Sequence, residues 1–148
     1  MTILFVENEK DKKKEIIEYL CHILKKPIIK EVESIMSGFV ELSEREYDYV
    51  LLDMSLPLYD SNVNDEDNIT VPFGGLDILD EIERLQLSSK VIVITAFDVI
   101  EDDAKRLTIW ELDYVMKEEY TNNYYGCIHY DQSSLEWKST ILGWMGEE

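Results

Sequence analysis

Four short apolar runs in this chain each end directly before a polar residue that can bind phosphate or a metal ion. The runs and the residues after them are 3–6 with Glu7, 49–52 with Asp53, 91–94 with Thr95, and 112–116 with Lys117. Short continuous apolar runs are typical of strands buried on both faces of a parallel sheet. Open α/β sheets bind ligands in the crevice at the carboxyl ends of such strands. The runs therefore predict an α/β fold with acids, a hydroxyl and an ammonium gathered at one edge.

The spacing of the other apolar residues predicts helices between these strands. Expected strands cover residues 2–6, 28–32, 48–52, 91–96 and 112–116. Expected helices cover residues 11–25, 37–46, 76–87, 99–109 and 133–145. Residues 58–75 are expected to form a long polar loop, and residues 124–130 are a candidate extra strand. Alternating strands and helices imply right-handed crossovers and a parallel sheet with helices on both faces.

Length and cysteine content narrow the class of protein. A chain of 148 residues favours a single domain over residues 1–148. No apolar run is long enough to cross a bilayer and no secretory signal precedes the first strand, so a cytoplasmic location is expected. The two distant cysteines, Cys21 and Cys127, fit reduced thiols better than a disulfide framework, although a bridge between them stays open.

The charge balance points to protein partners. Acidic residues number 32 against 14 basic ones, which gives a net charge of −18. Such a chain repels nucleic acid and anionic membranes, because affinity for phosphate backbones comes largely from Lys and Arg. The one dense basic run, at residues 12–14, lies in a predicted helix with Glu15 and Glu18 nearby. It is interpreted as a solvated helical face.

Taken in order, the polar residues at the strand ends resemble the receiver domain of bacterial response regulators. The pattern is an acidic cluster after the first strand, Asp53 after the third, Thr95-Ala96 after the fourth and Lys117 after the fifth. The resemblance covers residues 1–117, and residues 118–148 form an atypical loop and a last helix. It implies a flavodoxin-like fold with a doubly wound, five-stranded parallel sheet in the order 2-1-3-4-5, a long loop after the third strand and an extended C-terminal segment.

Asp53 matches the phosphoacceptor of the receiver family. A carboxylate oxygen that attacks a phosphoryl donor forms an aspartyl phosphate, and the resemblance implies that Mg²⁺ neutralises the charge. The implied metal ligands are Glu7, Asn8, Asp53 and the backbone carbonyl of Ser55. Asn8 replaces an acid of the family, which removes one negative charge and should weaken Mg²⁺ binding. An ordinary polar loop with a helix cap is the alternative at residues 7–9.

The resemblance also assigns a switch. Thr95 matches the hydroxyl that contacts the phosphoryl group, Lys117 matches the phosphate-binding lysine, and Tyr114 matches the aromatic residue that moves with the threonine. Glu118 stands where the family has proline, so a trans peptide is expected after Lys117. Core packing for Tyr114 is an alternative to the switch role.

The expected function is a response-regulator receiver that accepts a phosphoryl group on Asp53 with Mg²⁺ and switches a protein-binding surface. Its expected partners are a histidine kinase or phosphotransfer protein and a downstream protein, with no nucleic acid and no membrane. A homodimer is a family expectation. No enzyme activity is expected beyond phosphorylation and dephosphorylation of its own aspartate. The alternative is a receiver-like binding module that acts without phosphorylation.

Two enzyme classes fit the sequence poorly. Phosphatases of the haloacid-dehalogenase type need a second Asp two residues after the first, and Ser55 stands there. A P-loop enzyme is excluded because no Lys-Ser or Lys-Thr follows Gly74-Gly75. The Tyr-rich residues 120–130 include Cys127 and His129, which are weak evidence for a metal site. A covered edge or a partner surface is the favoured interpretation of that stretch.

Overall fold

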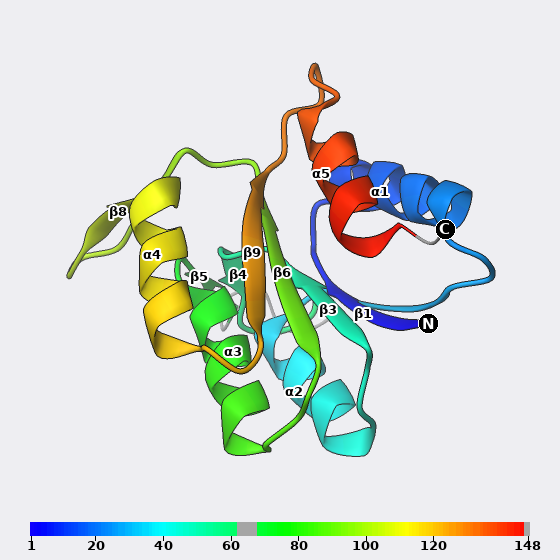
Figure 1. The fold of residues 1–148 in the computed structure, drawn as a ribbon. Helices are drawn as coiled ribbons and strands as arrows, with labels where there is room; N and C mark the ends of the chain where they lie inside the picture. Colours follow the sequence, from blue (N-terminus) through cyan, green and yellow to red (C-terminus); the bar gives the residue numbers. More distant parts are fainter. Residues whose placement is uncertain (62–67, 147–148) are drawn as a thin grey trace.

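The computed structural model describes residues 1–61 and 68–146, and its centre is a parallel sheet of five strands. Their spatial order is β2-β1-β3-β6-β9 (Figure 1), with each neighbouring pair parallel. In chain order the strands are β1 (Thr2–Val6), β2 (Ile28–Val32), β3 (Tyr49–Leu52), β6 (Lys90–Thr95) and β9 (Tyr124–His129). The expected order 2-1-3-4-5 is confirmed, with β6 as the fourth strand and β9 as the fifth.

Helices cover both faces of the sheet (Figure 1). The helices α1 (Lys10–Ile23) and α5 (Glu136–Met145) pack on one face. The other face carries α2 (Ile35–Glu44), α3 (Gly74–Arg84) and α4 (Ile109–Glu119). The doubly wound α/β class expected from the sequence is therefore confirmed. Within residues 1–61 and 68–146, no helix combines the length and the apolar character needed to cross a membrane.

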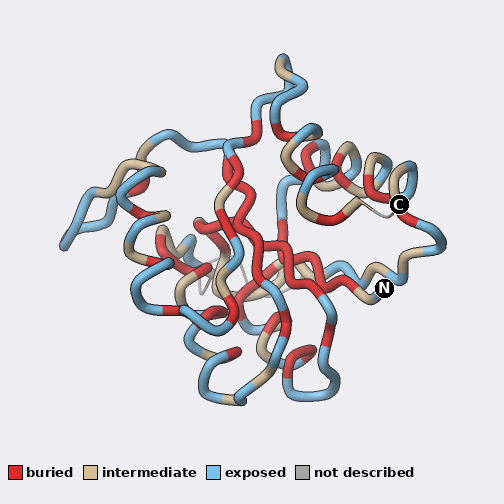
Figure 2. Tube along the Cα trace, viewed as in Figure 1, coloured by how far each residue is buried: buried red, intermediate tan, exposed pale blue. Residues whose placement is uncertain are grey.

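Successive residues of the central strands serve two separate cores. In β1, Ile3 and Phe5 pack toward α1 and α5, whereas Leu4 and Val6 pack toward α2, α3 and α4. The same alternation holds in β3 and β6, and Figure 2 shows the buried residues concentrated on these strands. Side chains alternate across a strand, so only strands with continuous apolar sequence can fill both cores. This is why the apolar runs identified β1, β3 and β6.

A short hairpin follows β3. The strand β4 (Leu56–Pro57) pairs antiparallel with β5 (Thr70–Val71), and the amide of Leu58 donates to the carbonyl of Ile69 at 2.8 Å. The expected continuous loop over 58–75 is therefore wrong at residues 70–71, and α3 begins at Gly74. Residues 62–67 of the expected loop lie outside the described residues.

The segment between β6 and β9 differs from the sequence expectation. Instead of the expected helix over 99–109, β7 (Val99–Glu101) and β8 (Arg106–Thr108) form an antiparallel hairpin there. The expected strand over 112–116 is also wrong, because these residues lie inside α4. A capping box between Thr108 and Glu111 begins this helix. Four residues apart on one face, Leu112 and Met116 are fully buried, which is helical spacing.

The candidate extra strand at 124–130 is confirmed and takes the fifth place in the sheet. Its start is fixed by Asn123, whose side-chain amide donates to the carbonyls of Leu87 at 2.7 Å and Ser89 at 3.0 Å. The carbonyl of Asn123 accepts from the amide of Val91 at 2.9 Å. These bonds hold β9 beside β6 from its first residue. Cys127, on this strand, is a free thiol, as is Cys21.

Candidate functional site

The carboxyl ends of β1, β3 and β6 meet at one edge of the sheet and bring the predicted acids together. Val6 pairs with Leu52 in the sheet register, so Glu7 and Asp53 follow side by side, and the amide of Asp53 donates to the carbonyl of Val6 at 3.2 Å. Both residues are buried. The same edge carries an open pocket of about 620 Å³. Its lining residues are Asn8, Glu9, Lys10, Lys12, Asp53, Ser55, Thr70, Ala96, Phe97 and Tyr130.

Lys12 is the cation of this site. Its Nζ lies 2.6 Å from Oε1 of Glu7 and 3.2 Å from Oδ2 of Asp53. It also donates to the backbone carbonyl of Ile94 at 2.7 Å. Only 3% of the Lys12 residue is exposed. The interpretation of residues 12–14 as a solvated helical face is therefore wrong for Lys12, a site residue that the sequence pattern did not reveal.

The local sequence explains how Lys12 reaches this position. Glu9 caps α1, with its carboxylate accepting the amides of Asp11 at 2.9 Å and Lys12 at 2.6 Å. Lys12 is therefore in the first turn of α1, directly above the end of β1. A cation in a first turn is disfavoured by the helix dipole, which is positive at that end. The carboxylates of Glu7 and Asp53 compensate for that position.

Glu7 is the fully buried acid of the site. Its Oε2 accepts the amide of Glu9 at 3.1 Å, whereas no hydrogen bond of regular geometry reaches Oε1 within the described chain. Oε1 instead makes the ion pair with Lys12. Burial and the neighbouring charge of Asp53 raise the pKa of the Glu7 carboxyl, and Lys12 opposes this shift without cancelling it. Two carboxylates sharing one ammonium produce this behaviour.

Asp53 faces the pocket with one carboxylate oxygen. Oδ1 accepts the amide of Met54 at 2.7 Å, and Oδ2 lies next to Lys12. About 10% of the Asp53 side chain is exposed, so a small donor in the pocket has access to it. An ionised carboxylate in this position is a nucleophile with a cation beside it.

The remaining predicted residues near this edge have different contacts. Thr95 is fully buried, and its Oγ1 accepts the amide of Phe97 at 3.2 Å. Asn8 is exposed and lines the pocket. Ser55 also lines the pocket and donates its hydroxyl to the carbonyl of Pro72 at 2.9 Å. Asp53, Asn8, Ser55 and the neighbours of Thr95 are thus brought to one place.

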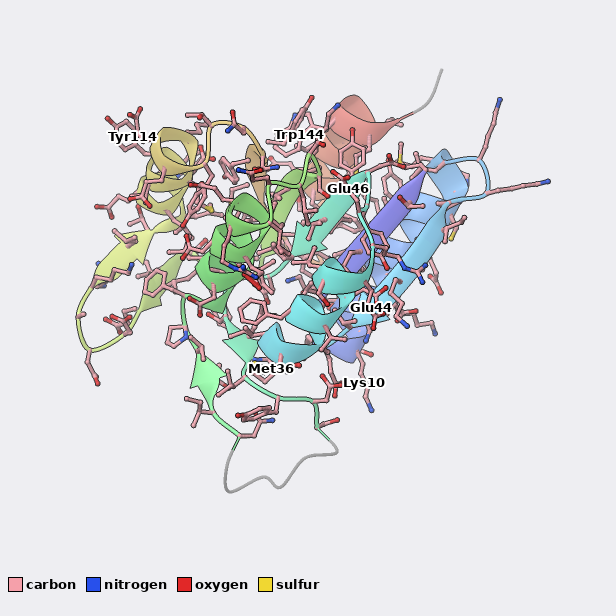
Figure 3. The ribbon with its side chains drawn as sticks, turned by 90° about the horizontal axis from the view of Figure 1, so that it is seen from below. Lys10, Met36, Glu44, Glu46, Tyr114 and Trp144 are labelled. Carbon is pink, nitrogen blue, oxygen red and sulfur yellow. The ribbon has the colours of Figure 1, made fainter. Side chains whose placement is uncertain are left out.

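Lys117 and Tyr114 are not brought to this place. Both lie on α4, because the strand expected to end at Lys117 is a helix. Lys117 is exposed, and its Nζ pairs with Oδ2 of Asp113 one turn away at 2.9 Å. Tyr114 is 67% exposed, and Figure 3 shows its side chain at the outer edge of α4, pointing away from the sheet. The phosphate-binding role expected for Lys117 therefore has no support in this arrangement, and neither does the switch role expected for Tyr114 or its alternative as a core aromatic.

The end of β9 supplies other residues in the position that the family gives to its lysine. His129 pairs with Asp98 at 3.1 Å, and the ring of Tyr130 lies 5.9 Å from Nζ of Lys12. The hydroxyl of Tyr130 donates to Glu15 at 3.1 Å. Burial raises the pKa of the Cys127 thiol to about 12. Within residues 1–61 and 68–146, Cys127 and His129 belong to no group of three or more His, Cys, Asp or Glu side chains that could hold a metal ion, so their metal interpretation has no support.

The donor set does not fit a divalent cation in this arrangement. Mg²⁺ needs several oxygen ligands around one point. The ammonium of Lys12 already lies between the carboxylates of Glu7 and Asp53, and the carboxylate of Glu9 accepts two backbone amides at the start of α1. Within the described part of the chain, no group of three or more His, Cys, Asp or Glu side chains could hold a metal ion.

The sheet order and the acids at the ends of β1 and β3 define a receiver fold, and solved receiver domains match the chain along almost its whole length. The Mn²⁺-bound form of response regulator Rcp1 matches with a TM-score of 0.62 and 17% identity, over 96% of this chain and 89% of that one. The receiver domain of sensor histidine kinase PA1611 from Pseudomonas aeruginosa PAO1, with magnesium in its active-site cleft, matches with a TM-score of 0.59 and 18% identity, over 99% and 98%. The resemblance noted from the sequence is confirmed for the fold.

Among curated proteins the chain is similar to the Detocs response regulatory protein DtcB of Vibrio alginolyticus. The two are 24% identical over 143 residues, which cover 95% of this chain and 96% of DtcB. No family model matches the chain. The proteins of known role that it resembles are signalling proteins, and the metal ions named above belong to the solved neighbours.

Proposed function

We propose that this chain is a response-regulator receiver that accepts a phosphoryl group on Asp53 and thereby changes its affinity for a protein partner. The observation that carries the proposal is the position of Asp53. Asp53 directly follows β3 at the edge of the sheet and lines an open pocket. Its Oδ2 lies 3.2 Å from Nζ of Lys12. The similarity to a response regulatory protein supports the same role.

The proposed reaction is nucleophilic attack by the Asp53 carboxylate. A lone pair of one carboxylate oxygen forms a bond to phosphorus while the bond from phosphorus to the leaving atom of the donor breaks. The leaving atom keeps the electron pair of that bond. Lys12 holds positive charge beside the attacking oxygen and reduces its repulsion with the incoming anion. Thr95 keeps its proposed role as a switch hydroxyl, because Oγ1 uses a lone pair for Phe97 and retains its own proton.

Mg²⁺, which the family resemblance implied, is not a step in this proposal. The solved neighbours hold Mg²⁺ or Mn²⁺, but in this chain the two carboxylates hold Lys12 instead. The labelling experiment is therefore carried out both with and without Mg²⁺. The proposed partners remain a histidine kinase or phosphotransfer protein and a downstream protein. A homodimer, a single-domain organisation and a cytoplasmic location stay predictions.

A binding module that acts without phosphorylation is the second candidate, and one observation favours it. Lys12 already pairs with Glu7 and Asp53 in the unmodified chain, and Lys117 lies elsewhere on α4. Within the described residues, the site therefore lacks a second lysine paired with Asp53 that could bind an added phosphoryl group. This candidate predicts that replacing Asp53 by alanine leaves partner binding unchanged.

The experiment is labelling by acetyl phosphate, followed by intact mass measurement with and without Mg²⁺. We expect the wild-type chain to gain the mass of one phosphoryl group and Asp53→Ala to gain none. Asp103→Ala is the matched control, because Asp103 is an exposed acid far along the chain and should leave labelling intact. If the wild-type chain gains no mass either with or without Mg²⁺, the proposal is overturned. The binding module that acts without phosphorylation is then the remaining candidate.

A further inference from the structure

The ammonium of Lys12 is surrounded by oxygen atoms from the ends of three strands. Its three oxygen neighbours are Oε1 of Glu7 after β1, Oδ2 of Asp53 after β3 and the carbonyl of Ile94 in β6, at 2.6, 3.2 and 2.7 Å. A lysine ammonium has three N–H donors and no acceptor. All three donors therefore have an oxygen within reach, and these oxygens come from the strand ends where the receiver site lies.

The burial of Lys12 makes this arrangement a built site. The residue is 3% exposed, and Glu7 is fully buried. Lysines are rarely buried unless they are paired, because removing an ammonium from water is costly. Lys13, its neighbour in the chain, makes only a longer pair with Glu31 at 3.7 Å and is more exposed. One lysine of the run thus belongs to the site, and the others lie outside it.

We infer that Lys12 supplies at this site the positive charge that a divalent cation supplies in metal-bound receivers, so that a phosphoryl-type anion binds at Asp53 without any divalent cation. This inference rests on the proposed function, since it concerns the same carboxylate. Two carboxylates and one ammonium leave the site with a net charge of −1, and the ammonium lies 3.2 Å from Oδ2 of Asp53, beside the oxygen that the anion would approach.

Replacing Lys12 should also change how anion binding at Asp53 depends on Mg²⁺. When Lys12 is replaced by methionine, Glu7 and Asp53 are left facing each other with no cation. Two free carboxylates at one point are the ligands that Mg²⁺ prefers. The substitution should therefore convert a cation-independent site into a Mg²⁺-dependent one.

The probe is beryllium fluoride, which binds carboxylates as a phosphoryl analogue, observed by fluorine NMR on the full chain. The wild-type chain in metal-depleted buffer should show the bound fluorine signal, and added Mg²⁺ should not increase its occupancy. Lys12→Met should lose the signal in metal-depleted buffer and regain it with Mg²⁺. Lys14→Met, which removes an exposed lysine from the same helix, should behave as wild type.

A second variant keeps the test decisive if Lys12→Met fails to fold. The double variant Glu7→Gln with Lys12→Met keeps the net charge of the site at −1 and removes one buried carboxylate, and it should give no signal without metal. A wild-type chain that binds only with Mg²⁺, or a double variant that binds without it, would overturn the inference and leave the proposed function standing. A wild-type chain that binds in neither buffer would overturn both.

Discussion

The ends of β1, β3 and β6 and the segment from α4 to β9 illustrate two different relations between sequence and receiver fold. At the three strand ends, the polar residues lie at one edge of the sheet as expected, and Glu7 and Asp53 are adjacent. In the C-terminal segment, the residues that matched the family pattern lie on a helix, and Lys117 pairs with Asp113 on the surface. The positive charge of the site comes instead from the opposite end of the chain, through Lys12 of α1.

The comparison shows that the cation beside Asp53 comes from α1 and not from the segment that matched the family's lysine. What the fold conserves is the meeting point of the strand ends, which backbone pairing determines. Which side chain reaches that point depends on local capping and helix geometry. Glu9 sets the start of α1 and thereby directs Lys12 to the acids.

The largest expected effect comes from removing the cation of the strand-end region. Lys12→Met should lower the free energy of unfolding by about 3–5 kcal/mol, because it leaves uncompensated buried carboxylates. Urea unfolding followed by tryptophan fluorescence measures the change. Lys14→Met is the control, and the Glu7→Gln partner substitution should recover part of the loss. A change no larger than that of the control would mean that Lys12 is not an integral part of the site.

The next effect tests whether β9 is a structural strand of the sheet. A Cβ added at Gly126 would meet the ring of Trp144 on α5, labelled in Figure 3, whereas a Cβ at Gly143 would meet nothing within 4 Å. Gly126→Ala should destabilise the protein by ~1–3 kcal/mol through overpacking. Gly143→Ala should stabilise it by ~1 kcal/mol through helix propensity. Equal effects of the two substitutions in thermal unfolding would contradict the packing of α5 on β9.

A smaller effect tests the helix that stands in place of the expected fifth strand. Oγ1 of Thr108 accepts the amide of Glu111 at 3.2 Å, and the Glu111 carboxylate accepts the amide of Thr108 at 3.0 Å. Thr108→Ala should cost about 1 kcal/mol of stability by removing this cap. Thr121→Ala, at an exposed turn after α4, is the control. If denaturant midpoints for both variants equal that of wild type, the capping box does not hold α4.

The smallest effect is expected at Lys117. The side chain is exposed and pairs only along its own helix, so Lys117→Ala should leave acetyl phosphate labelling of Asp53 unchanged. Surface pairs of this kind contribute little to stability. Labelling rates measured by intact mass on the variant and on wild type check this expectation. A strong loss of labelling would mean that Lys117 takes part in the reaction at Asp53, and it would contradict the difference between the two regions.

Continuous apolar sequence predicts the three innermost strands of the sheet, β1, β3 and β6. The runs that form β1, β3 and β6 fill two cores at once, and few other structures use such sequence. Asp53 and Glu7 follow from these strands because they stand directly after them. The three central strands and the meeting of the two acids are therefore predictable from the residues, whereas the receiver fold and the strand order come from the resemblance to a known family.

The C-terminal third is harder to predict because a short apolar run is ambiguous between strand and helix. Leu112 and Met116 are four residues apart, which fits a helix, and Thr108 with Glu111 is a capping-box signature that favours the same element. Lys12 is hidden in a run of three lysines. Its signal is a cation in the first turn of a helix beside two acids, an unfavourable position unless the acids face it.

The bond from Lys12 to the carbonyl of Ile94 joins residues 82 positions apart in the chain. Such a contact closes a long loop, and it connects the start of α1 to β6, which is joined to β1 only through β3. A chain that has folded only its first βαβ unit leaves the lysine in water and its acids unmatched. The contacts of Lys12 with Glu7, Asp53 and Ile94 therefore exist together only in a chain whose strands β1, β3 and β6 are all assembled.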